Sequence, residues 1–447
     1  MRALFGDFDA DPYPGRPKIL FIGVATSTHT HSWVDLLDET EMNVRLFALP
    51  TPGGIPPEDW KVRTYVTADT CPKLDKDTRV SLYSLNPVRW RDRILRKILR
   101  KTGLVPLFLD DTKEKRWLAQ IIRRWRPYVV HTLELGPKEL QERWLAQIIR
   151  CWRPDIIHTL GLDPAGYFYF RVCSRLELTG IGKWVLQLRG GSDLTLSRLD
   201  PEASIRIGRV LRECDQLVSD NEQNFDFALE MGARKEQISP LGTVPGTGGV
   251  DVTPLAQSWH DFPSSRRIIL WPKAYECPWS KALPVFEALN LAWDRIQPCE
   301  LYMLAMNAET RMWYWALPER IRQFCHAEDR IPRDKVLELM VQARVMLAPS
   351  LVDGTPNSMF EAMAAGAFPI VSPLETMQPL VENEQNVLFA RNLYPYDIAE
   401  ALCRAMSDDA LVDSAAEINL KLVRRVADRS EIRPRVIEYY ERLAADK

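Results

Sequence analysis

Two carboxylates stand at the ends of one short polar stretch, DGTPNSMFE, which Asp353 opens and Glu361 closes. Pro356 to Ser358 have the composition of a helix start, where unpaired backbone N–H groups bind phosphate. An acid ahead of that turn can accept hydrogen bonds from sugar hydroxyls, and an acid in the first helical turn can hold a ribose diol. The stretch therefore offers contacts for all three parts of a nucleotide sugar: the sugar, the diphosphate and the ribose.

The elements around this stretch have to hold it in place. The spacing predicts a helix over 359–365 with Gly366 as its C-terminal stop, followed by a strand over 368–371. An apolar run over 345–348 predicts the strand that precedes the stretch. In open α/β sheets, ligands bind beyond the carboxyl ends of the strands.

The same rhythm of strand, loop and helix runs through most of the chain and predicts an α/β fold. Strands are expected over 18–24, 43–49, 156–159, 184–188, 216–219, 267–271, 300–305, 345–348 and 368–371, with helices over 165–178, 201–213 and 221–231. The polar segment 25–32 is expected to be a loop at a strand end, and so a second candidate site, with a helix starting at Trp33.

The length of 447 residues favours two domains. A turn-rich, Gly- and Pro-containing passage over 240–254 places the boundary near residue 262. We expect two Rossmann-like domains, 1–262 and 263–428, with a cleft between them, and a final helix over 429–447.

From Asp353 onward, the pattern acid-G-T-P-N-S-x-x-E-A-M-A-x-G-x-x-P-I-V resembles the donor-site motif of family-4 retaining glycosyltransferases, which have the GT-B fold. Four other segments resemble the same family: RGGSDL (189–194), GGVD (248–251), RRIILWPKAYECPWSKALPVFEAL (266–289) and LVENEQNVLFARNLYPYDIAEAL (380–402). The resemblance covers nearly the whole chain and is strongest over 240–405. It implies that 1–262 binds the acceptor, that 263–428 binds the donor, and that the helix over 429–447 crosses back to the first domain.

The resemblance implies a role for individual residues. Asp353 would bind the hydroxyls of the transferred sugar, Glu361 the ribose, and Lys273 and Lys281 the leaving diphosphate, with Lys281 at the start of a helix. The alternative for the lysines is an ordinary solvated surface position. The other implied donor-site residues are Gly354, Thr355, Asn357, Ser358 and Met359. The catalytic candidates are Asp353, Lys281, His158 and His29, and the acceptor or cleft candidates are Thr28, His29, Ser192 and Asp193.

Three positions depart from the family pattern. Asp353 stands where Glu is commoner, which shortens the contact to the sugar by one methylene. The first loop, ATSTHTHSW, lacks a Gly-Gly pair and resembles a subset of the family with His-Thr-x-x-Trp. At the strand end near 158 the family often has His-x-His, whereas this chain has His158 followed by Thr159 and Leu160. An active-site role for His158 is weighed against a packed histidine at the strand end.

The resemblance implies front-face transfer with retention of anomeric configuration, with the leaving phosphate helping to take the acceptor proton. No metal is expected, because basic residues can neutralise the diphosphate, and no cofactor beyond a UDP- or GDP-linked co-substrate. Two alternatives remain open. One is a GT-B nucleotide-sugar epimerase or a phosphorylase, and the other is a non-catalytic protein that binds nucleotide sugars.

The overall composition excludes several classes of function. A net charge of −2 gives no general attraction for nucleic acid, and the hydrophobic and charged fractions of 46% and 26% are those of a globular protein. Eight scattered cysteines, without a C-x-x-C pair, and an N-terminus unlike a signal peptide lead us to expect a cytoplasmic protein.

Two further segments stand out. One is a tandem duplication, in which RWLAQIIRRWRPYVVHTL (116–133) is repeated as RWLAQIIRCWRPDIIHTL (143–160). We expect the second copy to supply the strand of the sheet. His131, in the first copy, is expected to be a relic of the duplication. The segment 86–101 has seven basic residues, one acid and an apolar helical stripe. It is interpreted either as a helix on the inner face of an anionic membrane or as a solvated surface helix.

Overall fold

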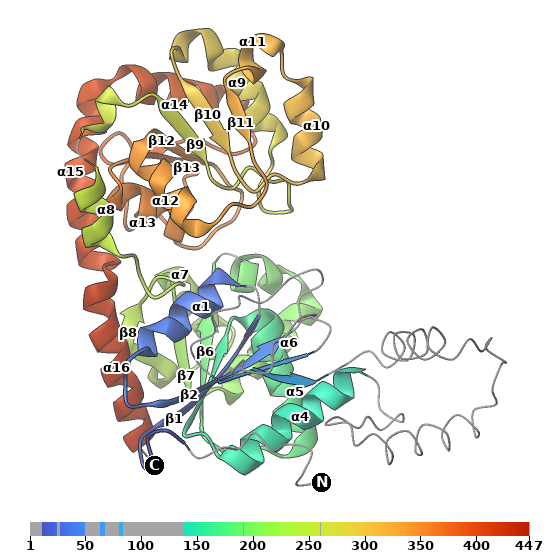
Figure 1. Cartoon of the computed structure of the whole chain (residues 1–447). Helices are drawn as coiled ribbons and strands as arrows, with labels where there is room; N and C mark the ends of the chain where they lie inside the picture. The colour runs from blue at the N-terminus through green and yellow to red at the C-terminus, as the bar shows by residue number, and fades with distance from the viewer. Residues whose placement is uncertain are drawn as a thin grey trace, which may run out of the picture. The chain divides into compact units, whose positions relative to one another are not determined.

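The chain is described by a computed structural model that covers residues 11–24, 27–49, 63–67, 80–83, 137–190, 192–259 and 261–446 (Figure 1). It divides into two compact units. The first comprises Met1–Thr30, Leu37–Leu186 and Tyr440–Lys447, and the second comprises His31–Leu36 and Gln187–Tyr439. The predicted segments 86–101 and 116–133, and His131, lie outside the described residues.

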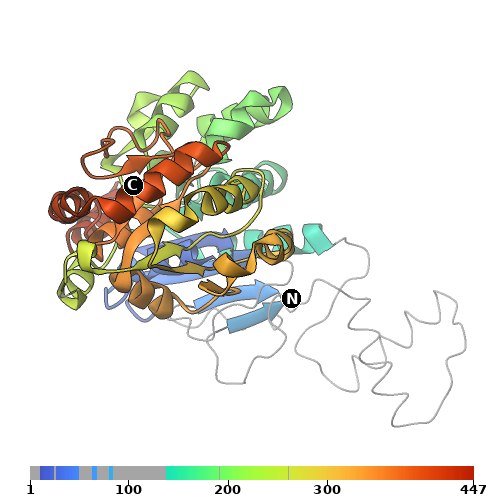
Figure 2. The same ribbon diagram turned by 90° about the horizontal axis from the view of Figure 1, so that it is seen from above.

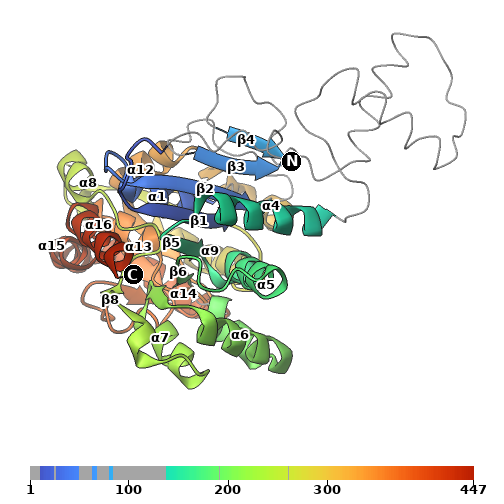
Figure 3. The same ribbon diagram turned by 90° about the horizontal axis from the view of Figure 1, so that it is seen from below.

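The first half of the chain builds an eight-stranded sheet in the order β4-β3-β2-β1-β5-β6-β7-β8. Its strands are β1 (Lys18–Val24), β2 (Asn43–Leu49), β3 (Arg63–Thr67), β4 (Val80–Tyr83), β5 (Ile156–Leu160), β6 (Lys183–Leu188), β7 (Gln216–Ser219) and β8 (Ile238–Thr243). The pairings of β1 with β2 and with β5 are parallel, as are those of β2 with β3 and β3 with β4. Figures 2 and 3 show β1 and β2 side by side.

Helices in this part of the chain are α1 (Thr28–Val34), α4 (Pro137–Trp152), α5 (Tyr167–Leu176), α6 (Pro201–Glu213) and α7 (Glu222–Glu230). Local capping sets some of their boundaries: the Asp200 side chain accepts a hydrogen bond from the Ala203 N–H at 2.7 Å, with Pro201 in the first helical position. The expectation of a loop up to residue 32 was wrong, because α1 already begins at Thr28.

The second half builds a six-stranded sheet in the order β11-β10-β9-β12-β13-β14, and its pairings are parallel. Its strands are β9 (Ile268–Trp271), β10 (Glu300–Met303), β11 (Cys325–Ala327), β12 (Ala343–Ala348), β13 (Phe368–Val371) and β14 (Leu388–Phe389). The helices are α8 (Val252–Ser258), α9 (Leu283–Ile296), α10 (Ala308–Ala316), α11 (Glu319–Arg322), α12 (Arg333–Gln342), α13 (Asn357–Ala364), α14 (Pro395–Ser407), α15 (Asp409–Val426) and α16 (Arg429–Ala445).

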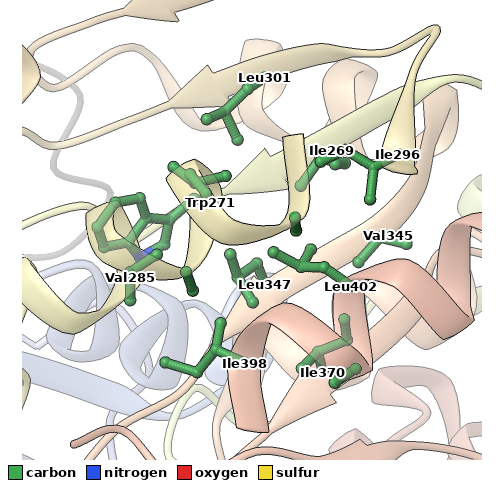
Figure 4. Close-up of a cluster of buried hydrophobic side chains, with 14 of the residues drawn as sticks. Ile269, Trp271, Val285, Ile296, Leu301, Val345, Leu347, Ile370, Ile398 and Leu402 are labelled. Atoms are coloured by element: carbon green, nitrogen blue, oxygen red, sulfur yellow. The ribbon is translucent and has the colours of Figure 1, made fainter. Parts of the chain in front are cut away.

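Side chains alternate between the two faces of this second sheet, as the strand period requires. Ile269, Val345 and Ile370 enter a core on the face covered by α9 and α14 (Figure 4). Leu270 and Met346 point to the opposite face, whose core includes the buried residues of α13. A sheet buried on both faces requires nearly continuous apolar strands, which is the pattern the sequence shows.

The predicted α/β architecture of two parallel sheets is confirmed. The second copy of the duplicated segment does supply a helix, α4, and a central strand, β5, between β1 and β6. The C-terminal segment is helical, and Tyr440–Lys447 belong to the first unit. In the part of the chain that is described, no helix is both long enough and apolar enough to cross a bilayer.

Candidate functional site

The predicted polar stretch, 353–361, spans the end of the connection from β12 to α13 and the first residues of α13. The Asp353 carboxylate turns back on this loop and accepts a hydrogen bond from the Gly354 N–H at 2.9 Å. The Thr376 hydroxyl donates to the Asp353 carbonyl at 2.9 Å and fixes the loop to a neighbouring segment. The helix begins at Asn357, and Gly366 stands just past its end with a φ of 77°, as predicted.

The start of α13 carries two buried hydroxyls that are not satisfied by the protein. Thr355 is 3% exposed and Ser358 is 9% exposed, and within the described residues neither hydroxyl oxygen has a hydrogen-bond partner. Asn357 is held by the Thr247 hydroxyl at 2.7 Å, whereas the Met359 N–H already donates to the Pro356 carbonyl at 3.0 Å. Because a buried hydroxyl without a partner is costly, Thr355 and Ser358 are suited to a polar ligand.

Asp353 forms an ion pair with Lys273, which follows β9. The distance from the lysine Nζ to the carboxylate Oδ2 is 3.1 Å. The nearby carboxylate raises the pKa of Lys273, so the lysine stays charged. The structure thus brings together the residue expected to bind the sugar and one of the two expected to bind the diphosphate.

The second predicted lysine is held by the loop between β9 and α9. Its Nζ lies 3.0 Å from the Glu276 carboxylate and 3.0 Å from the Cys277 carbonyl. Asn392, which is buried, accepts from the Lys281 N–H at 2.9 Å and donates to the Lys281 carbonyl at 3.0 Å. The expectation that Lys281 begins the helix was wrong by two residues, because α9 starts at Leu283, with a proline in its first turn.

Glu361 pairs with Arg333 at the start of α12, with 2.5 Å between the carboxylate Oε1 and the guanidinium. Burial raises the pKa of Glu361, and the Arg333 guanidinium opposes that shift. The helix assignment places Glu361 just beyond the first turn of α13 rather than within it. All four charged residues predicted to contact the donor are therefore paired with an opposite charge in the protein, in three ion pairs.

A pocket of about 120 Å³ opens beside the Lys273–Asp353 pair. It is lined by these two residues together with Tyr275, Trp279 and Ser350 among others, whereas Lys281 is outside the lining. Sequence reasoning did not single out Glu276, Arg333 or the two aromatic residues. The basic and aromatic content of segment 266–289 was the available signal, but partners such as Arg333 come from separate elements.

Asp220, just past β7, is a further carboxylate that the sequence reasoning missed. Its two oxygens accept hydrogen bonds from the Gly190 N–H at 2.8 Å and from the Asn221 side chain at 2.7 Å. Burial raises the pKa of Asp220 to about 7, and the nearby carboxylates Asp353 and Asp193 add to that shift. A Cβ on Gly354 would lie 2.6 Å from the Gly190 Cα and 2.8 Å from Asp220 Oδ2, so glycine is required there.

The remaining predicted residues occupy other settings. His158 lies within β5 and is fully buried, with Nδ1 2.5 Å from the Tyr440 hydroxyl. Thr28 and His29 are in the first turn of α1, and Ser192 and Asp193 begin the helical turn Ser192–Leu196. The Asp193 carboxylate accepts from the Arg189 N–H at 2.9 Å. Among the described residues, no group of three or more His, Cys, Asp or Glu side chains is placed to hold a metal ion.

Residues 286–408, which contain the whole β12–α13 connection, match the family model described as glycosyl transferases group 1. The chain is a glycosyltransferase. Comparison with curated proteins gives no match. The family match therefore rests on the part of the chain that contains Asp353 and Glu361.

Solved structures of low sequence identity share the fold of this glycosyltransferase. Sucrose-phosphate synthase from Thermosynechococcus elongatus is 14% identical, with 97% of this chain and 100% of that chain covered and a TM-score of 0.65. HepE from Anabaena in complex with UDP-glucose is 11% identical, with 94% of this chain and 98% of that chain covered and a TM-score of 0.61. A UDP-forming trehalose-phosphate synthase from Burkholderia xenovorans is 15% identical, with 96% of this chain and 99% of that chain covered and also a TM-score of 0.61. The fold is GT-B.

Proposed function

We propose that this glycosyltransferase moves a sugar from a UDP- or GDP-linked donor to a glycan, lipid-linked or small-molecule acceptor, with retention of configuration, as family-4 enzymes do. One observation carries the proposal. Asp353 and Glu361, each beside a cation, bracket a helix start at which the Thr355 and Ser358 hydroxyls are buried without a protein partner. That arrangement fits a sugar, a diphosphate and a ribose in sequence.

In the proposed reaction the acceptor oxygen attacks the anomeric carbon on the face from which the diphosphate leaves. The bond from that carbon to the phosphate oxygen breaks, its electron pair stays on the phosphate, and the acceptor proton passes to the same oxygen. Lys273 and Lys281 lie on the loop before α9 and would stabilise the charge that builds on the diphosphate. No metal or other cofactor is required by this scheme.

Both lysines already form an ion pair with a carboxylate in the structure, so the diphosphate of the donor would replace or share these carboxylates. The diphosphate would share Lys273 with Asp353 and compete with Glu276 for Lys281. The Lys281 backbone is fixed on both sides by Asn392, so this lysine can change partner without moving its main chain. The UDP-glucose found in HepE, which shares the fold, supports testing uridine donors first.

The test is a thermal-shift series with UDP-, GDP- and ADP-sugars, since a ligand that binds only the native state raises the melting temperature. We expect one nucleotide class to raise it, and Glu361→Gln to reduce that rise. Glu338→Gln, on an exposed glutamate of α12 paired with Lys335, is the matched control and should leave the rise intact. NMR of the product of the preferred donor then reports whether the anomeric configuration is retained.

Donor binding without hydrolysis or transfer over a panel of acceptors would favour the non-catalytic alternative. Inversion at the anomeric carbon would contradict the proposed mechanism while leaving the donor site intact. Unchanged donor affinity in Glu361→Gln would refute the assignment of the ribose contact.

A further inference from the structure

The pocket beside Asp353 has an aromatic wall that the proposed function does not use. Trp279 lines the pocket and is 42% exposed, so this residue is accessible to a ligand. Tyr275 lines the same pocket, and burial raises the pKa of its hydroxyl, which keeps it protonated and able to donate. Exposed tryptophan is costly to leave in water, and here it stands next to a carboxylate and a lysine.

The main chain holds Trp279 in position independently of its side chain. Its carbonyl accepts a hydrogen bond from the Leu351 N–H at 2.8 Å, which joins the β9–α9 loop to the β12–α13 loop. Cys277 and Ser280 close a tight turn around it, with N–H to carbonyl distances of 3.0 and 3.3 Å. Substitution of the indole therefore leaves these backbone contacts in place.

The polar groups of the pocket are balanced in charge. The Lys273–Asp353 pair supplies a positive donor and a negative acceptor 3.1 Å apart. Ser350 also lines the pocket, and within the described residues its buried hydroxyl has no hydrogen-bond partner. Such a set satisfies several hydroxyl groups, whereas an added carboxylate would meet the like charge of Asp353, and Lys273 would already be shared between Asp353 and the diphosphate.

Size limits what the pocket can enclose. Its volume of about 120 Å³ is below the range of roughly 300–1,000 Å³ typical of sites that enclose a whole drug-sized ligand. One ring of a larger ligand fits this space better than a complete nucleotide sugar does. A pyranose ring has one face of C–H groups, which can pack on an indole, and an edge of hydroxyls.

We propose that Trp279 is a specificity-determining residue, whose indole packs on the C–H face of the transferred pyranose, and that the pocket selects a neutral hexose over a hexuronic acid. This inference rests on the proposed function, because it assigns the sugar moiety of the donor to the pocket beside Asp353. The indole would contact the sugar and not the nucleotide. Loss of this contact should therefore lower the affinity for a nucleotide sugar but not the affinity for the bare nucleotide.

The experiment measures dissociation constants by calorimetry for UDP, UDP-glucose and UDP-glucuronic acid, with GDP and GDP-mannose in parallel. We expect Trp279→Ala to weaken nucleotide-sugar binding about 3- to 10-fold, the range for one aromatic contact, with the bare nucleotide changed by less than about 2-fold. Trp279→Phe should recover part of the loss. Trp315→Ala, which removes a 65% exposed tryptophan on α10, is the matched control and should change neither constant.

Wild-type enzyme should bind UDP-glucose more tightly than UDP-glucuronic acid, and Asp353→Asn should narrow that difference by leaving Lys273 free to meet the acid. Equal losses for nucleotide and nucleotide sugar in Trp279→Ala would overturn the inference, as would equal wild-type affinity for the two UDP-sugars. In either case the proposed donor site would survive. A wild-type protein that binds none of these nucleotides would overturn both.

Discussion

His158 and Asp353 offer a direct comparison, since both are polar residues associated with central strands of parallel sheets. β5 runs between β1 and β6, and β12 runs between β9 and β13. His158 lies inside its strand, is fully buried and is bonded to Tyr440, whereas Asp353 follows the last residue of its strand by five positions. The Asp353 side chain is 25% exposed and lines a pocket.

Position relative to the strand end explains this difference. Within a parallel strand both faces are covered, so a polar side chain needs a partner from the packing layer, and Tyr440 supplies it. Beyond the carboxyl end the chain leaves the sheet, and its side chains can reach a ligand. The family resemblance marks both positions as catalytic candidates, and the burial of each separates them.

The largest effect that would sharpen this comparison is expected at Asp353. Asp353→Ala removes the proposed contact to the sugar and leaves Lys273 without this carboxylate, so transfer should fall by at least about 100-fold, as for loss of one preorganised group. Steady-state turnover with the preferred donor measures this, with circular dichroism to verify the fold. Asp294→Ala, on a carboxylate that is 83% exposed and pairs with Arg320, serves as the control and should keep full turnover.

The His158–Tyr440 contact should affect stability instead of chemistry. Tyr440→Phe leaves a buried imidazole nitrogen without this hydrogen bond, which should lower the free energy of unfolding by about 1–3 kcal/mol. Turnover per folded molecule should stay within about 2-fold of wild type. Denaturant titration and kinetics check the two parts. Tyr396→Phe, which removes a hydroxyl from a 73% exposed residue, should change neither.

A loss of turnover without a loss of stability in Tyr440→Phe would break the comparison. It would show that the histidine within the strand takes part in the reaction. His158→Gln would then be expected to abolish transfer while donor affinity persists.

Asp220 tests the comparison at a third strand, because it stands just beyond β7 and is nevertheless buried. The pKa of Asp220 is about 7 in the folded protein, above its ordinary value of 3.8, so the folded state holds this proton more tightly than the unfolded state. Its contribution to stability is present at low pH and is lost as the pH rises through about 7. The groups that face it are Asp353, Asp193, the Gly190 N–H and the Asn221 amide.

Melting temperatures of wild type and Asp220→Asn, measured from about pH 5 to about pH 8, should therefore converge or cross, with wild type losing more stability as the pH rises. Asp226→Asn, on an exposed carboxylate of α7, should follow the wild-type curve. Parallel curves for wild type and Asp220→Asn would show that Asp220 is ionised throughout, like a residue open to solvent.

The smallest effect is expected at Ser358. Its buried hydroxyl has no partner among the described residues, so Ser358→Ala should leave the melting temperature unchanged or slightly higher. The affinity for UDP or GDP should fall about 2- to 10-fold, the value of one hydrogen bond. Ser414→Ala, which removes a hydroxyl that donates to the Leu411 carbonyl, should not affect nucleotide affinity. Lower stability with unchanged affinity would assign the Ser358 hydroxyl to packing alone.

Much of the fold could be predicted because parallel strands buried on both faces are apolar throughout. The predicted ranges 18–24, 43–49, 216–219 and 368–371 coincide with β1, β2, β7 and β13. β8 was missed because its Pro240 signals a turn, yet proline is tolerated in a strand at the edge of a sheet, where β8 lies. β14 has only two residues, which is too short to show a period.

The candidate site could be predicted only as far as it is local in sequence. The loop from Asp353 to the start of α13 follows from turn residues and a helix start that lie within nine positions of one another. Partners from distant segments left no such trace: Arg333 reaches Glu361 from α12, and Asn392 holds Lys281 across 111 positions. The ion pairs that Lys273 and Lys281 form with carboxylates could likewise not be predicted from the sequence.

The sequence by itself determined the alternation of apolar strands with helices and the polar turn that opens α13, because backbone preferences and hydrophobic period act between near neighbours. Only the tertiary structure decided which polar groups are buried, which charges are already paired and which hydroxyls have no partner. Those properties depend on side chains that converge from separate elements. They separate the buried His158 from the accessible Asp353.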